Sequence, residues 1–179
     1  MTQFIGLVIS ILVSFVLGAL LTYLVGFKEE ITELNENEPE TKLTEGTVEV
    51  ASPVSGKVIP VSKVNDEAFA SEMMGKGVGI IPNDGKVYAP FDGTISALFD
   101  TNHAVGLTGE NGLETLIHIG IDTVKLDGKG FKVHTKTDAS VKKGDLLVEF
   151  DKELLEKEGF DTTVIFIVVN MDQVKDMKI

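Results

Sequence analysis

Two histidines of this 179-residue sequence have the type and spacing to do chemistry. His103 and His118 lie in two alternating apolar runs on either side of residues 109–112. Imidazole, whose free pKa is about 6.5, is neutral at pH 7 and can act as a nucleophile or bind a metal ion. A neighbouring imidazole can donate a hydrogen bond to a transferred group. The pair therefore suits a metal site, a structural hydrogen-bonded pair, or a phosphoryl acceptor with its helper.

The residues GENG at 109–112 predict a β-hairpin between the two runs. With all four residues in the loop, Thr108 pairs with Leu113. The same register places His103 directly opposite His118. A shorter Asn-Gly turn also leaves both histidines on one face of the hairpin. The sequence therefore predicts two adjacent imidazoles.

Side chains of a strand alternate between its two faces, which sorts the neighbours of the two histidines. On the second strand, Leu116 and Gly120 share the face of His118. The residues predicted to point from that strand into the core are Ile117, Ile119 and Ile121. On the first strand, the residues predicted to share the histidine face are Phe99, Thr101, His103 and Val105.

The pattern of the sequence from Gly46 onward is typical of an all-β protein. Short apolar runs alternate with Gly, Asn, Asp and Pro after roughly ten residues, which predicts an antiparallel β-sandwich rather than βαβ units. Two short helices interrupt this pattern. The first is expected to begin at the N-cap Asn65 and stop at Gly75, and the second to run from Asp151 to Gly159.

The composition excludes several classes of site and partner. The sequence has no cysteine, so it has no disulfide framework, thiolate zinc site or cysteine nucleophile. Its formal net charge is −12, and such an acidic chain repels the phosphates of nucleic acid. An acidic surface instead favours a basic protein partner.

The first 27 residues have no charged side chain and form an apolar run long enough to cross a bilayer. Residues 1–27 are therefore predicted to form a transmembrane helix; a secretory signal peptide is disfavoured because no basic residue precedes the run. Lys28 favours a cytoplasmic location for the residues on its C-terminal side. Residues 28–46, with seven Glu against two Lys, are typical of an acidic linker, which leaves residues 47–179 as one folded domain.

Three stretches of the sequence resemble one protein family. They are SPVSGKVIPVSKVNDEAFASEMMGKGVGI at 52–80, VYAPFDGTISALFDTNHAVGL at 87–107 and GLETLIHIGIDTVKLDGKGF at 112–131. Together they resemble the glucose/β-glucoside-type enzyme IIA (type-1) domain of the bacterial phosphoenolpyruvate-dependent sugar phosphotransferase system, roughly over residues 47–172. Thr115 is more polar than the aliphatic residue often found at its position. The resemblance implies an all-β, antiparallel β-sandwich of the barrel-sandwich hybrid type with short helices.

The resemblance also implies roles for four residues. His118 matches the histidine that accepts a phosphoryl group from the phospho-histidine of the carrier protein HPr. His103 matches the second histidine, which stabilises the transferred group, and Thr101 matches the threonine that orients it. Gly120 matches the glycine whose backbone fixes the ring of His118. The phosphoryl group then passes to a cysteine of an enzyme IIB domain and on to a sugar, with no cofactor and no metal.

Further positions match the docking face of the family and its membrane part. The apolar docking positions are Phe69, Met74, Phe99 and Leu116, and the rim carboxylates, expected to attract a basic carrier, are Asp66 and Asp122. Residues 1–27 resemble the last membrane helix of a β-glucoside-type IIC permease. This implies partnership with a permease in the cell membrane, with the phosphocarrier domain in the cytoplasm. The sequence is accordingly expected to be a fragment of an IIBCA-type protein.

Two alternatives come from other motifs. APFDGTI at 89–95 and VKKGDLLVEF at 141–150 resemble the strand corners of biotinyl/lipoyl-like carrier domains, but the Met-Lys-Met hairpin of those domains is missing. A zinc hydrolase with a hybrid sandwich needs a His-x-His motif, which the sequence lacks. The phosphocarrier interpretation is therefore favoured.

Overall fold

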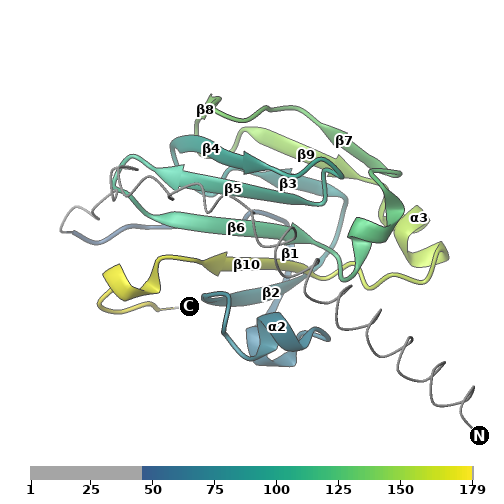
Figure 1. Cartoon of the computed structure of the whole chain (residues 1–179), viewed down its shortest axis with the longest axis horizontal. Coiled ribbons are helices and arrows are strands. Elements are labelled where there is room, and N and C mark those ends of the chain that lie inside the picture. The colour runs from purple at the N-terminus through teal and green to yellow at the C-terminus, as the bar shows by residue number, and fades with distance from the viewer. Residues whose placement is uncertain (1–45, 179) are drawn as a thin grey trace, which may run out of the picture. The chain divides into compact units, whose positions relative to one another are not determined.

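The computed structural model describes residues 46–178, which form two antiparallel sheets (Figure 1). The larger sheet has seven strands, in the spatial order β1 (Gly56–Pro60), β2 (Lys76–Pro82), β10 (Val164–Val168), β6 (Glu114–Ile119), β5 (Ala104–Gly109), β4 (Gly93–Leu98) and β8 (Ser140–Val141). The smaller sheet has three, in the order β3 (Lys86–Tyr88), β9 (Leu146–Phe150) and β7 (Phe131–Val133). The predicted all-β antiparallel class is confirmed.

Short helical segments connect some of these strands. They are η1 (Val61–Lys63), α2 (Glu67–Ala70), η2 (Thr123–Leu126), α3 (Lys152–Lys157) and η3 (Met171–Gln173), of which the three η segments are 3-10 turns. Within residues 46–178, no helix is long and apolar enough to span a membrane. The predicted transmembrane helix at 1–27 and nearly all of the acidic linker lie outside the described residues.

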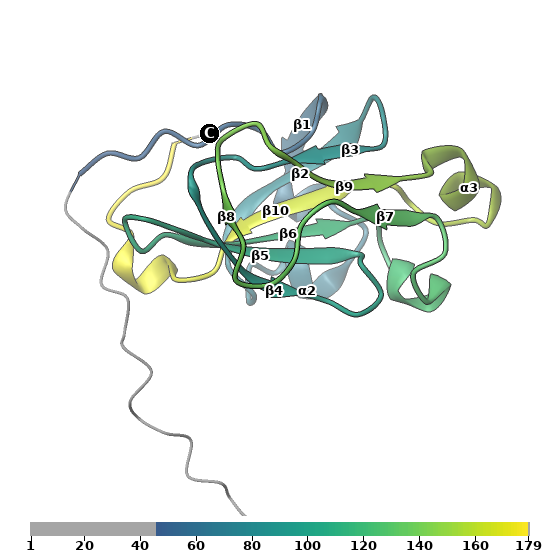
Figure 2. The same cartoon turned by 90° about the horizontal axis from the view of Figure 1, so that it is seen from above.

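The main core joins the two sheets, whose strands Figure 2 shows from above. Val87 and Val148 reach it from the smaller sheet, and Val105, Ile117 and Ile119 from the larger; all five are fully buried. Burial of one such side chain contributes about 1.5–3 kcal/mol, so this cluster is what fixes the sheets face to face. The predicted β-sandwich is confirmed, as is the inward direction of Ile117 and Ile119.

A second, smaller apolar cluster lies on the other face of the larger sheet, beneath η1 and α2. Its buried members are Val61, Val64, Phe69, Ile121, Ile165 and Ile167. Ile165 of β10 lies directly opposite His118 of β6, so His118 borders this cluster. The prediction that Ile121 joins the main core is wrong, because Gly120, at φ +73°, ends the alternation of β6 and turns Ile121 into the second cluster.

Both short helices begin at an aspartate. The carboxylate of Asp66 accepts hydrogen bonds from two backbone N–H groups in the first turn of α2, so the prediction of Asn65 as the cap is wrong by one residue. The carboxylate of Asp151 accepts from the Leu154 N–H at 2.9 Å and caps α3, as predicted. The cap at Asp66 fixes the start of the helix that lies over the histidines.

The hairpin of β5 and β6 has a three-residue loop instead of the predicted four-residue loop. The Gly109 N–H donates to the Leu113 carbonyl at 2.8 Å, which leaves residues 110–112 in the loop. Gly112 has φ +86°, the left-handed conformation that ends three-residue hairpin loops. This loop shifts the register of the two strands by one residue.

The predicted register, with His103 opposite His118, is therefore wrong by one residue. Ala104 is the residue opposite His118. Val105, which the sequence placed on the histidine face, points into the main core and pairs with Ile117. A slip of one residue moves every side chain of a strand to the other face.

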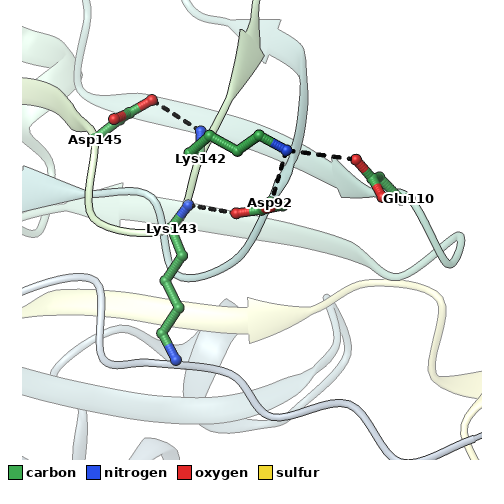
Figure 3. A network of polar contacts seen from close by, with 5 residues as sticks. All are labelled: Asp92, Glu110, Lys142, Lys143 and Asp145. Carbon is green, nitrogen blue, oxygen red and sulfur yellow. Dashed lines mark hydrogen bonds and ion pairs between the residues drawn. The ribbon is translucent and has the colours of Figure 1, made fainter.

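Charged groups link three turns on the surface of the sandwich (Figure 3). The Lys142 ammonium lies 3.0 Å from Asp92 and 3.8 Å from Glu110, which belongs to the β5–β6 loop. The backbone N–H of Lys143 donates to Asp92 at 2.7 Å, and that of Lys142 donates to Asp145 at 2.8 Å. The hydrogen bonds from Lys143 and Lys142 lower the pKa of Asp92. Exposed pairs add little stability individually, so the network mainly orients these turns.

Candidate active site

The two imidazoles come together although they are not cross-strand partners. His103 ends the turn before β5, and its carbonyl accepts a hydrogen bond from the Ile119 N–H at 2.7 Å. Ala104, opposite His118, has only a methyl group, which leaves space for the ring of His103. The ring centroids of His103 and His118 lie 4.9 Å apart, with an interplanar angle of 82°. The predicted adjacency is confirmed, although the register that produces it differs.

Two phenylalanines flank the histidine pair. The ring of Phe69, from α2, lies 5.1 Å from that of His118, and the ring of Phe99 lies 5.7 Å from that of His103. Phe69 is 5% exposed, whereas Phe99 is 45% exposed. Apolar rings exclude water from the side of the imidazole that they cover, which disfavours its charged form.

The surroundings of both imidazoles favour the neutral form of the ring. Burial, followed by the effect of His103, lowers the pKa of His118 from 6.5 to about 4. The backbone of Gly120 and the carboxylates of Asp66 and Asp122 act in the opposite direction without cancelling this effect. Burial also lowers the pKa of His103. A neutral ring keeps a lone pair on one nitrogen, which a nucleophile requires.

The two nitrogens of the His118 ring have different surroundings. Nδ1 is buried and has no hydrogen bond of good geometry to any described residue. The backbone of Gly120 is nevertheless close enough to raise the pKa of His118 against the effect of burial. His118 as a whole is half-buried, and Nε2 is not among the enclosed nitrogens, so we expect an incoming group to reach Nε2.

Thr101 holds the ring of His103. Its Oγ1 lies 2.5 Å from Nδ1 of His103. When the hydroxyl donates this bond, the proton of the neutral ring lies on Nε2, which becomes a hydrogen-bond donor. His103 is only 7% exposed, so the bond orients a ring with little freedom to move.

The remaining apolar positions expected in the docking face differ in exposure. Met74 is as exposed as Phe99, whereas Leu116 is half-buried against the second cluster. Met73, which the sequence did not single out, is 86% exposed and adjoins Met74. Exposed methionines adapt their shape to a partner surface, and three rotatable bonds per side chain make this possible.

Two carboxylates act on the site from a short distance. Asp66 and Asp122 both raise the pKa of His118 electrostatically, which places negative charge beside the ring. Asp122 also pairs with Lys125, whose ammonium lies 2.6 Å from its carboxylate. The two carboxylates are therefore in position to attract a positively charged partner.

Thr123 is a residue of the site that sequence reasoning missed. It is fully buried, and its hydroxyl donates a hydrogen bond to the carbonyl of Ile119, the residue after His118. The sequence around Thr123 does not distinguish it as a site residue, because a threonine after an aspartate is equally typical of an ordinary turn. Only the fold shows which carbonyl it reaches.

Comparison with known proteins gives one family match and several similar curated proteins. The family described as phosphoenolpyruvate-dependent sugar phosphotransferase system, EIIA 1, matches residues 48–174. The glucose-specific EIICBA component of Staphylococcus saprophyticus is 47% identical over 135 residues, which are 73% of this chain and 20% of that protein. The β-glucoside-specific EIIBCA component of Dickeya chrysanthemi is 40% identical over 179 residues, which are 96% of this chain and 28% of that protein.

A solved structure supports the same relationship. The structure of glucose permease IIA from Mycoplasma capricolum is 34% identical in sequence and covers 75% of this chain and 88% of its own. Its TM-score against the present structure is 0.66. The present chain spans between 20% and 28% of the length of the curated relatives described above.

Proposed function

The chain belongs to the EIIA 1 family of the phosphoenolpyruvate-dependent sugar phosphotransferase system, and on that premise we propose that it is a phosphocarrier whose acceptor is His118. The observation that carries this proposal is the edge-to-face contact of the His118 and His103 rings, in surroundings that lower the pKa of His118 and enclose its Nδ1. A neutral nucleophile beside a hydrogen-bond donor is what transfer of a phosphoryl group requires.

In the proposed transfer, the Nε2 lone pair of His118 attacks the phosphorus of the phospho-histidine of HPr. A new N–P bond forms as the donor's N–P bond breaks, and the donor nitrogen takes back the electron pair. In this proposal the proton of the neutral His118 ring lies on Nδ1, and the backbone of Gly120, which raises the pKa of His118, is the group that keeps it there. The ring therefore attacks without first losing a proton.

His103 and Thr101 stabilise the transferred group in this proposal. The Thr101 hydroxyl donates to Nδ1 of His103, so Nε2–H of His103 is free to donate to a phosphoryl oxygen. Because charge spreads over the phosphoryl oxygens during transfer, such a donor lowers the barrier. The role of His103 is electrostatic, and it forms no bond to phosphorus.

In this proposal, one docking face of the domain binds two partners in turn. We place Phe69, Met74, Phe99 and Leu116 at its apolar centre, because rings and exposed methionine exclude water around the phosphoryl group. Asp66 and Asp122 lie at the rim, where they attract a basic carrier such as HPr. The phosphoryl group then moves to the cysteine of an enzyme IIB domain and from there to a sugar that a IIC permease transports.

The acceptor cysteine lies outside this sequence, which contains none. We propose that residues 1–27 form the last membrane helix of a IIC domain and that residues 47–179 face the cytoplasm. This is supported by the alignment to the Dickeya chrysanthemi EIIBCA component, which covers 96% of the chain and therefore extends well beyond the family match at 48–174. Membrane association of the full chain, lost on removal of residues 1–27, is the expected result of fractionation.

The phosphocarrier proposal is tested by labelling. The full chain is incubated with radiolabelled phosphoenolpyruvate, enzyme I and HPr, and one acid-labile phosphoryl group per chain is expected. His118→Ala removes the label, while His134→Ala, at an exposed histidine paired with Glu149, serves as the matched control and keeps it. Label that persists in His118→Ala contradicts the proposal.

A further inference from the structure

Thr123 contacts the backbone on both sides of the peptide that joins Ile119 to Gly120. Its hydroxyl donates to the Ile119 carbonyl at 2.5 Å. Its methyl group packs against Gly120: a Cβ added to Gly120 would lie 2.6 Å from Cγ2 of Thr123. Thr123 is fully buried, so both contacts are shielded from water. One side chain thus holds the two residues that follow His118.

The hydroxyl supplies a donor that the sheet does not. The N–H and C=O of one residue in an antiparallel strand point to the same neighbouring strand, here β5. The N–H of Ile119 donates to the His103 carbonyl at 2.7 Å, but β5 begins only at Ala104. The Ile119 carbonyl instead accepts from Thr123. A buried carbonyl without a donor is costly, so this bond fixes the local backbone.

These contacts connect the two histidines through Ile119. One backbone hydrogen bond joins Ile119 to His103, and the Thr123 hydroxyl holds the other end of the same residue. The next residue, Gly120, has φ +73° and donates its N–H to the Thr163 carbonyl at 3.1 Å. The orientation of the Gly120 backbone beside the His118 ring therefore depends on Thr123 on one side and on Thr163 on the other.

We propose that Thr123 is a positioning residue that holds the Ile119–Gly120 peptide so that the ring of His118 keeps its proton on Nδ1 and presents Nε2 to the phosphoryl donor. This inference deepens the proposed function and rests on it. Thr123 does not touch the transferred group. Its hydroxyl and its methyl act separately, because the first fixes the carbonyl of Ile119 and the second fills the space beside Gly120.

The experiment compares two nearly isosteric changes in the full chain. Thr123→Val keeps the methyl and loses the hydroxyl, and Thr123→Ser keeps the hydroxyl and loses the methyl. The ¹⁵N chemical shifts of the His118 ring report which nitrogen holds the proton, and the rate of phosphorylation by phospho-HPr reports the transfer. In Thr123→Val the ring shifts are expected to move toward a mixture of tautomers and the rate to fall about three- to tenfold. Thr123→Ser is expected to keep the wild-type ring shifts.

Thr115→Val is the matched control. Thr115 of β6 is also buried, and its hydroxyl donates to the Leu107 carbonyl at 3.2 Å. Its side chain points to the face of β6 opposite that of His118. This variant is expected to lose stability without changing the His118 ring. Unchanged ring shifts and rate in Thr123→Val, or equal changes in Thr115→Val, overturn the proposal.

Two further outcomes are also decisive. If Thr123→Val does not fold, Thr123→Ser alone decides. Altered His118 ring shifts in Thr123→Ser overturn the proposal, because they show that the hydroxyl is not sufficient to position the ring of His118. Failure of the proposed function is recognised separately, since the wild-type chain then takes no phosphoryl group while its ring shifts still report on Thr123.

Discussion

The protonation of His118 is the most quantitative consequence of the structure. Burial and the nearby His103 lower the pKa of His118 from 6.5 to about 4. At pH 5, a free imidazole is about 3% neutral, whereas a ring with the lowered pKa is about 90% neutral. Lowering the pH from 8 to 5 is therefore expected to leave His118 almost entirely neutral in the folded chain.

The same shift links pH to stability. Between pH 6.5 and about 4 the unfolded chain binds a proton at His118 that the folded chain does not. The free energy of unfolding therefore falls as pH falls through this window, by at most about 3 kcal/mol, and His118 adds no further change below it. His118→Gln is expected to remove this part of the pH dependence, as urea unfolding at pH 7 and pH 4.5 measures.

The direct assay is an NMR titration of the His118 ring protons and nitrogens from pH 8 to pH 3.5. The same chain unfolded in urea provides the reference titration near pH 6.5. A midpoint well below 5.5 in the folded chain is the predicted result. A midpoint near 6.5 refutes the reasoning, because it means that neither burial nor His103 controls the charge of the ring.

Three further changes test other contacts of the site. Thr101→Val removes the hydroxyl that lies 2.5 Å from Nδ1 of His103. Rapid-quench labelling is expected to show phosphorylation of His118 slowed about tenfold, and an unchanged rate contradicts an orienting role of Thr101. Phe69→Ala uncovers the His118 ring and leaves a cavity in the second cluster. The pKa of His118 is expected to rise toward 6.5, and the free energy of unfolding to fall by about 3 kcal/mol. An unchanged pKa of His118 contradicts this prediction. Asn170→Ala removes two hydrogen bonds to the β5–β6 hairpin: the Asn170 side chain donates to the Gly112 carbonyl at 2.8 Å and accepts from the Glu114 N–H at 3.0 Å. The free energy of unfolding in urea is expected to fall by about 2 kcal/mol, while His118 titrates as in the wild type.

The sequence predicted those features that depend on local patterns. Alternation placed Ile117 and Ile119 in the core, since a period of two determines which side of a strand faces the core. Asp151 and Gly159 marked the ends of α3, because capping and left-handed termination are local effects. These predictions needed no knowledge of the fold.

Other features depend on contacts that no local pattern contains. The register of the hairpin was wrong because the loop has three residues and ends at the left-handed Gly112, whereas the residues GENG suit a four-residue loop equally well. The contact of Phe69 with His118 joins residues far apart in the chain, so only the resemblance to a family suggested it. Thr115 also became clear only in the fold, where its hydroxyl finds the Leu107 carbonyl in the core.

In the proposed mechanism, Nε2 of His118 is the atom that accepts the phosphoryl group. The most direct test is ³¹P and ¹⁵N NMR of the ¹⁵N-labelled chain after phosphorylation by phosphoenolpyruvate, enzyme I and HPr. We expect one phosphorus, coupled to Nε2 of His118, with the signal still formed in His103→Gln and absent in His118→Ala. Phosphorus coupled to Nδ1 of His118, or to a nitrogen of His103, contradicts it.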